Sequence, residues 1–128
     1  MAVRPWQHVL EPLGGYLFLG ALLKETPQKY STAYNFGPMP ADHLYVKELA
    51  NLAIEVWGKG KWQDTSNKDE VHEANLLKLD ISKANKELHW QPKLNAAEAI
   101  RWTIEWYKKN DSERLDFSFT QIKTYQSL

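Results

Sequence analysis

The sequence predicts one α/β domain over residues 1–128 that is rich in helix and poor in strand. Three longer segments and one shorter segment show helical spacing or capping residues, and about three short segments are typical of strands. A sheet of two or three strands is a weak core by itself. Two alternatives remain: a small α/β domain, or a part of a larger sheet whose neighbouring strands lie elsewhere.

The first 25 residues predict an extended segment followed by a helix. Residues 3–9 are extended, and Pro12 suits the first turn of a helix that ends near Glu25. Its three glycines each lower helix propensity by about 1 kcal/mol relative to Ala. The run Tyr16-Leu17-Phe18-Leu19 is apolar on all sides. We therefore expect this helix to be buried in the chain or covered by a partner.

The middle of the chain predicts a strand and a second helix. Residues 33–38 are typical of a short strand that ends at a Gly-Pro pair. The helix runs from about Leu44 to Trp57, with Asp42 as its N-cap and Gly58 at its end. A polar loop is expected over residues 61–69.

The second half predicts a strand, two helices and a tail. Residues 74–79 suit a strand, and Asp80 can cap a short helix over residues 81–88. Asn95 and Glu98 have capping-box spacing before a helix over residues 96–109. The inner face of that helix is expected to carry Ile100, Thr103, Ile104 and Tyr107. The tail, about residues 111–128, has alternating Leu115, Phe117 and Phe119, and we expect it to dock.

Composition limits the function. Lys plus Arg and Asp plus Glu both number 16, which argues against a nucleic-acid partner. The chain has no Cys, and its four His lack metal-ligand spacing, so we predict no metal. The longest apolar stretch, residues 16–23, is too short to span a membrane, which takes roughly 20 residues. No signal peptide is visible, so we predict a cytoplasmic protein without a membrane partner.

Several motifs occur in a fixed order along the chain. They are Arg4-Pro5-Trp6-Gln7-His8-Val9-Leu10-Glu11-Pro12-Leu13, Tyr34-Asn35-Phe36-Gly37-Pro38, His72-Glu73-Ala74, Leu77-Lys78-Leu79-Asp80-Ile81-Ser82-Lys83-Ala84, Leu88-His89-Trp90-Gln91-Pro92 and residues 117–125. This ordered set resembles the extended short-chain dehydrogenases/reductases of the NAD-dependent epimerase/dehydratase family. Within that family it is most similar to members that dehydrate CDP-sugars.

The resemblance implies a fold and a chemistry. The fold would be the helix-rich C-terminal sugar-nucleotide-binding lobe, lacking most of the Rossmann sheet. Complete members are NAD-dependent lyases: NAD takes hydride from C4 of the glucose, water leaves across C5 and C6, and the hydride returns at C6. Such enzymes are expected in the synthesis of O-antigen sugars of lipopolysaccharide. This chain has neither Gly-x-Gly-x-x-Gly nor Tyr-x-x-x-Lys, so we assign no catalytic or cofactor-binding residue and expect no activity alone.

The resemblance also implies substrate-binding residues. Arg4 matches an Arg that binds pyrophosphate, and Trp6, His8 and His72 are further candidates for contact with a CDP-sugar. Each has a structural alternative. Arg4 could cap a carbonyl or pair with Glu11, Trp6 could pack, and His8 could be an ordinary hydrogen-bonded histidine.

Five further residues bear on how the sequence is interpreted. A structural role is favoured for Glu11, because a carboxylate near a helix N-terminus interacts well with the helix dipole. Relatives often carry Arg just before the position of His72, whereas this chain has Asp69 and Glu70, which would repel a diphosphate. Trp102 and Trp106, four residues apart on a helix, are expected to pack against another element.

Two classes of partner follow. The chain could bind a CDP-sugar and complement a separate Rossmann-domain chain that holds NAD. It could instead be a non-catalytic module that forms homo-oligomers through its apolar helix and tail, because a lobe without its sheet exposes apolar surface.

Overall fold

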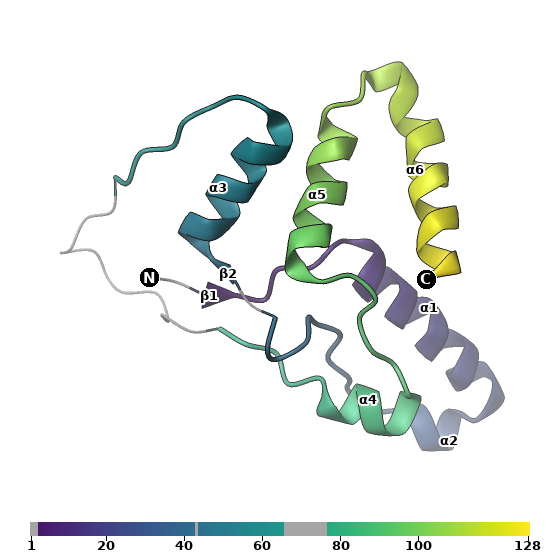
Figure 1. Ribbon diagram of the computed structural model, residues 1–128. Coiled ribbons are helices and arrows are strands. Elements are labelled where there is room, and N and C mark those ends of the chain that lie inside the picture. The colour runs from purple at the N-terminus through teal and green to yellow at the C-terminus, as the bar shows by residue number, and fades with distance from the viewer. Residues whose placement is uncertain (1–2, 43, 66–76) are drawn as a thin grey trace.

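The computed structural model describes residues 3–42, 44–65 and 77–128, which form six helices and one small sheet (Figure 1). The sheet consists of β1 (Val3–Arg4) and β2 (Leu44–Tyr45). The helices are α1 (Leu10–Glu25), α2 (Pro27–Tyr30), α3 (Val46–Trp57), α4 (Ser82–Leu88), α5 (Ala96–Tyr107) and α6 (Asp111–Ser127). The helix-rich composition is confirmed, and none of the described helices is long and apolar enough to cross a membrane.

The sheet is smaller than predicted and uses other residues. β1 and β2 are antiparallel, with Val3 opposite Tyr45 and Arg4 opposite Leu44. The predicted strand at residues 33–38 is wrong, because that segment has no strand partner in the described chain and is held by side chains instead. Gln7 Nε2, for example, donates to the carbonyl of Phe36 at 3.1 Å.

The strand predicted at residues 74–79 is also not found. Residues 74–76 lie outside the described residues, and residues 77–79 form no strand. One backbone hydrogen bond joins this segment to β1: the amide of Leu77 donates to the carbonyl of Val3 at 3.2 Å. A single hydrogen bond to β1 is not enough to add a third strand to the sheet.

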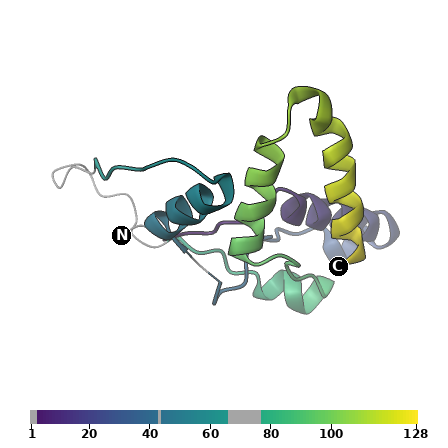
Figure 2. The same cartoon turned by 45° about the horizontal axis from the view of Figure 1, so that its top comes forward.

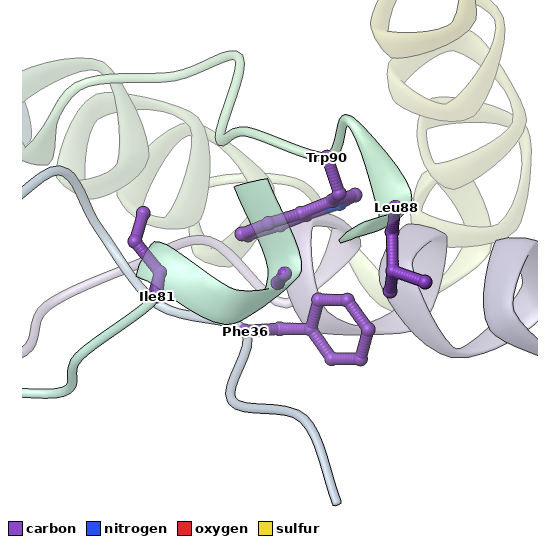
Figure 3. Close-up of a cluster of buried hydrophobic side chains, with 5 residues drawn as sticks. Phe36, Ile81, Leu88 and Trp90 are labelled. Carbon is purple, nitrogen blue, oxygen red and sulfur yellow. The ribbon is translucent and has the colours of Figure 1, made fainter. Parts of the chain in front are cut away.

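The main core cluster surrounds α4 (Figure 3). It consists of buried residues from three segments: Phe36, Ile81, Ala84, Leu88 and Trp90. The rings of Phe36 and Trp90 meet edge to face, with their centroids 4.9 Å apart. α1 closes the cluster through Gly15, where a Cβ would lie 2.5 Å from the ring of Phe36. Glycine is therefore required at position 15 because the Phe36 ring leaves no room for a Cβ, and not because of the φ angle of the residue.

The outer face of α1 is exposed. The helix itself is confirmed, although it begins at Leu10 instead of Pro12. Its expected burial within the chain is wrong: Tyr16, Leu17 and Phe18 are 60%, 78% and 43% exposed. α1 contacts the core cluster through Gly15, through the partly buried Leu19 and Leu22, and through the ring of Tyr16, which meets Phe36 edge to face. Cover of the outer face by a partner stays a prediction.

The start of α3 is set by a different residue from the one predicted. Asp42 does not cap α3; its Oδ2 accepts from the amide of Ala96 at 2.6 Å and so supports the start of α5. The N-cap of α3 is Tyr45, whose amide donates to Glu48 Oε2 at 2.8 Å. The end at Gly58 is confirmed, with φ 91° in the left-handed region that favours glycine.

α5 and α6 form an antiparallel helical hairpin that stands beside α1 and α3 (Figures 1 and 2). The capping box at Asn95 and Glu98 is confirmed, with hydrogen bonds of 2.8 and 2.9 Å. α5 ends at Tyr107, which is 57% exposed, so its expected place on the inner face is wrong.

The tail docks, as predicted, but as a helix and through other residues. α6 exposes Leu115 and Phe119, because a helix turns alternating residues onto different faces. The buried residues of α6 are Gln121 and Tyr125. Gln121 Nε2 donates to the carbonyl of Trp102 at 2.9 Å.

α4 begins as expected and ends on a strained residue. Asp80 Oδ1 accepts from the amide of Ser82 at 2.8 Å. Hydrogen bonding by the Ser82 side chain, and then by the Ser82 amide, lowers the pKa of Asp80. At the other end, His89 adopts φ 54° and ψ 27°. The amides of His89 and Trp90 both donate to the carbonyl of Ala84, which completes a left-handed helix end.

The strain at His89 predicts a stabilising substitution. A residue with a Cβ costs roughly 1–2 kcal/mol in the left-handed region, and glycine avoids this cost. Part of the gain is offset, because glycine also gives the unfolded chain more conformational entropy. His89→Gly should therefore raise the free energy of unfolding by roughly 0.5–1 kcal/mol, measured by urea denaturation. His89→Ala keeps the Cβ and is the control. A His89→Gly variant no more stable than His89→Ala would contradict the assigned strain.

Candidate functional site

The motif segment, residues 4–11, runs from β1 to the first turn of α1, and Arg4 stands at its beginning. Nη1 of Arg4 donates to the carbonyl of Val3 at 3.0 Å. Arg4 and Lys78 line one small depression of about 10 Å³ together with Pro38 and Met39. Asp42 also lines it, but the carboxylate of Asp42 accepts from the amide of Ala96. Two cations on one depression favour an anionic ligand.

Trp6 anchors the motif segment to the sheet. Its indole Nε1 donates to the carbonyl of Leu44 at 3.2 Å, and the side chain is half-buried. The bond fixes the chain between β1 and α1. The contact that the structure gives Trp6 is thus a packing and anchoring contact.

His8 is buried at the start of α1. Only 4% of the residue is exposed, and Nδ1 accepts from the amide of Leu10 at 3.3 Å. The imidazole meets the ring of Trp102 edge to face at 5.6 Å. Burial lowers the pKa of His8, so the neutral form is favoured. The predicted packing of Trp102 against another element is confirmed by this contact.

A cavity of about 490 Å³ lies between the motif segment and the α5–α6 hairpin. His8 and Gln7 line it together with polar and apolar side chains from α5 and α6, including Trp106, Gln121 and Ile122. Trp106 packs as predicted, since its Nε1 donates to Ser118 Oγ at 2.9 Å. Within the described residues, Gln7 Oε1 is buried and has no hydrogen-bond partner.

The structure does not bring the predicted site residues together. The depression at Arg4 and the cavity at His8 share no lining residue, and Trp6 lines neither of them. His72, Asp69 and Glu70 lie outside the described residues. Their assignment as site residues, and that of Arg4, Trp6 and His8, stays a prediction.

Glu11 forms the most extensive polar contact in the motif segment. Its carboxylate is fully buried. Oε1 accepts from the amides of Lys93 and Leu94 at 2.9 and 2.7 Å, and Oε2 accepts from the hydroxyl of Tyr125 at 2.8 Å. Burial, and then the bond to Glu11, raise the pKa of Tyr125. The structural role is confirmed, but its partners lie at least 82 positions away in sequence, where no local signal identifies them.

No group of three His, Asp or Glu side chains within the described ranges is arranged to hold a metal ion.

The buried imidazole predicts a pH dependence of stability. Because the pKa of folded His8 lies below its ordinary value of 6.5, the unfolded chain takes up a proton more readily. The free energy of unfolding should fall as the pH drops below about 6.5. The measurement is urea denaturation from neutral to acidic pH. In His8→Gln the free energy of unfolding should fall less with pH than in wild type. In His89→Gln, at an exposed histidine, it should fall as in wild type. Equal pH profiles for wild type and His8→Gln would contradict the prediction.

Comparison with known proteins identifies relatives of the chain. It is 35% identical to CDP-glucose 4,6-dehydratase of Salmonella typhimurium over 98% of this chain and 36% of that enzyme. It is 31% identical to dTDP-glucose 4,6-dehydratase of Streptomyces antibioticus over 84% of this chain and 30% of that enzyme. No protein-family model matches. The chain spans about a third of the length of these curated relatives. It is therefore a relative of the nucleotide-sugar 4,6-dehydratases, similar over nearly its whole length to CDP-glucose 4,6-dehydratase.

Proposed function

We propose that this chain is the nucleotide-sugar-binding part of a CDP-glucose 4,6-dehydratase-like protein, with the fold of a C-terminal lobe of an extended short-chain dehydrogenase. The observation that carries the proposal is the 35% identity over 98% of the chain, which includes the Arg4 motif. The helix-rich fold with one two-stranded sheet is compatible with such a lobe.

Arg4 is the residue proposed to contact the pyrophosphate of a CDP-sugar. A guanidinium offers a planar fork of donors and a permanent charge, which suit phosphate oxygens. Lys78 on the same depression adds a second positive charge. The depression itself holds only about 10 Å³, so a nucleotide sugar would lie across it rather than inside it. We therefore expect weak binding by this chain alone.

Dehydration of the sugar needs more than this chain carries. In the complete enzyme, bound NAD would accept and return the hydride. The sequence has no glycine-rich dinucleotide-binding motif and no Tyr-x-x-x-Lys pair, so its residues do not fit NAD. We assign this chain substrate contacts only, and we expect turnover to require a Rossmann-domain chain that supplies cofactor and catalytic groups.

A second candidate function is self-association without ligand binding. Four large apolar side chains of α1 are exposed to solvent for 43% or more of their surface, namely Leu13, Tyr16, Leu17 and Phe18. Exposed apolar surface can mark a contact with another protein. Under this alternative the Arg4 depression would have no ligand.

The two candidates are separated by titrating the purified chain with CDP-glucose while following Trp fluorescence, with UDP-glucose and CDP as comparators. We expect saturable binding that prefers CDP-glucose. Arg4→Ala should weaken it roughly 10- to 100-fold, the loss of a charged hydrogen bond. Arg101→Ala, at an exposed Arg on α5, is the matched control and should bind like wild type.

Two outcomes would contradict the proposal. One is an absence of saturable binding at millimolar CDP-glucose by a chain whose circular dichroism shows the expected helices. The other is equal binding by Arg4→Ala and Arg101→Ala. Either outcome would leave self-association as the better account.

A further inference from the structure

A second charged site lies far from the motif segment in sequence, where the end of α3 meets the turn between α5 and α6 (Figure 1). The described residues form an open cleft of about 510 Å³ there. Four cations line it, Lys59, Lys108, Lys109 and Arg114, against one acid, Asp111. In a chain with equal numbers of acidic and basic residues, this is a local excess of three positive charges.

Two of these cations are held in place by the fold. Nζ of Lys108 donates to the carbonyl of Val56 at 3.1 Å, which ties the end of α5 to the end of α3. The guanidinium of Arg114 lies 4.8 Å from the ring centroid of Trp106 and pairs with Asp111 at 2.5 Å. The only acid of the cleft is therefore engaged inside it. Positive charges that are already positioned bind an anion with less loss of side-chain entropy.

The cleft also carries aromatic surface. Trp57 and Tyr107 line it and are 39% and 57% exposed. Exposed rings beside fixed cations suit a ligand with a planar ring on one side and a phosphate on the other, because bases stack on aromatic side chains and phosphates pair with Lys and Arg.

We propose that this cleft binds a mononucleotide, with the phosphate on Lys59, Lys108 and Arg114 and the base against Trp57 or Tyr107. The inference does not rest on the function proposed above, because the cleft and the Arg4 depression share no lining residue. A nucleotide here would occupy a site separate from the one proposed for the sugar nucleotide.

The test uses AMP as the probe and backbone amide NMR of the full chain as the readout. We expect saturable shifts confined to residues 57–60 and 107–114, with pyrophosphate and adenosine each binding at least about tenfold more weakly than AMP. Lys59→Glu changes an exposed loop residue just after α3 and should weaken AMP about tenfold or more. Lys24→Glu, at an exposed lysine in the last turn of α1, is the matched control and should leave binding unchanged.

Three results would overturn the binding site itself: an absence of saturable shifts at millimolar AMP, shifts spread over lysines across the whole chain, and equal AMP binding by Lys59→Glu and Lys24→Glu. Pyrophosphate that binds as tightly as AMP would reduce the site to a general anion cleft and would overturn the assigned nucleotide. Arg4→Ala should bind AMP like wild type, so failure of this proposal and failure of the Arg4 site can be told apart.

Discussion

The buried carboxylate of Glu11 connects the parts of this structure. It lies at the beginning of α1 and accepts hydrogen bonds from the amides of Lys93 and Leu94 and from the hydroxyl of Tyr125. A fully buried carboxylate is strongly unfavourable unless donors replace its water. These three donors replace that water, and they come from the loop before α5 and from the last turns of α6. One side chain therefore joins the N-terminal, middle and C-terminal segments.

This connection gives the N-terminal motif two separate tasks. Three of its later residues hold the fold together: His8 and Glu11 are buried, and the indole of Trp6 donates to the carbonyl of Leu44 in β2. Its first residue, Arg4, lies on β1 and lines a depression that Lys78 also lines. A motif that marks a ligand site by resemblance thus contains more structural residues than ligand candidates. For this reason the function is proposed on Arg4 and not on the motif as a whole.

Four of the six described helices, α1, α3, α4 and α5, could be predicted because their signals are local. The capping box of Asn95 and Glu98 and the stop at Gly58 act within a few residues, and both were correct. The strands could not be predicted in this way, because a strand needs a neighbour. Residues 33–38 have strand-like composition but no strand to pair with in the described chain, and β2 forms instead where Leu44 meets Arg4.

The tail and the candidate site show the same limit. Alternation of Leu115, Phe117 and Phe119 does not indicate which residues of α6 are buried, because the docking of α6 is decided by Gln121 and Tyr125. The resemblance identified Arg4 and His8 as neighbours of one ligand, whereas the fold places them on separate surfaces. The cationic cleft between α3, α5 and α6 was not predicted, since its residues come from positions 57–59 and 107–114.

The exposed face of α1 limits what this chain does alone. Its inner side is fixed by Gly15 against Phe36, while Tyr16, Leu17 and Phe18 remain accessible. Such a face is compatible both with a separate Rossmann-domain partner and with a second copy of the chain. In either case the Glu11 carboxylate ties α1 to α6 through the hydroxyl of Tyr125.

The most direct test of this account is amide hydrogen exchange at Leu94, followed by NMR. The amide of Leu94 donates to Glu11 Oε1 at 2.7 Å, although it lies in a loop that forms no helix or strand. If the Glu11 carboxylate holds the segments together, this amide should exchange only through global unfolding, as slowly as the most protected amides of α5. Exchange at the rate of an unprotected loop would show that Glu11 is not the central connection of the fold.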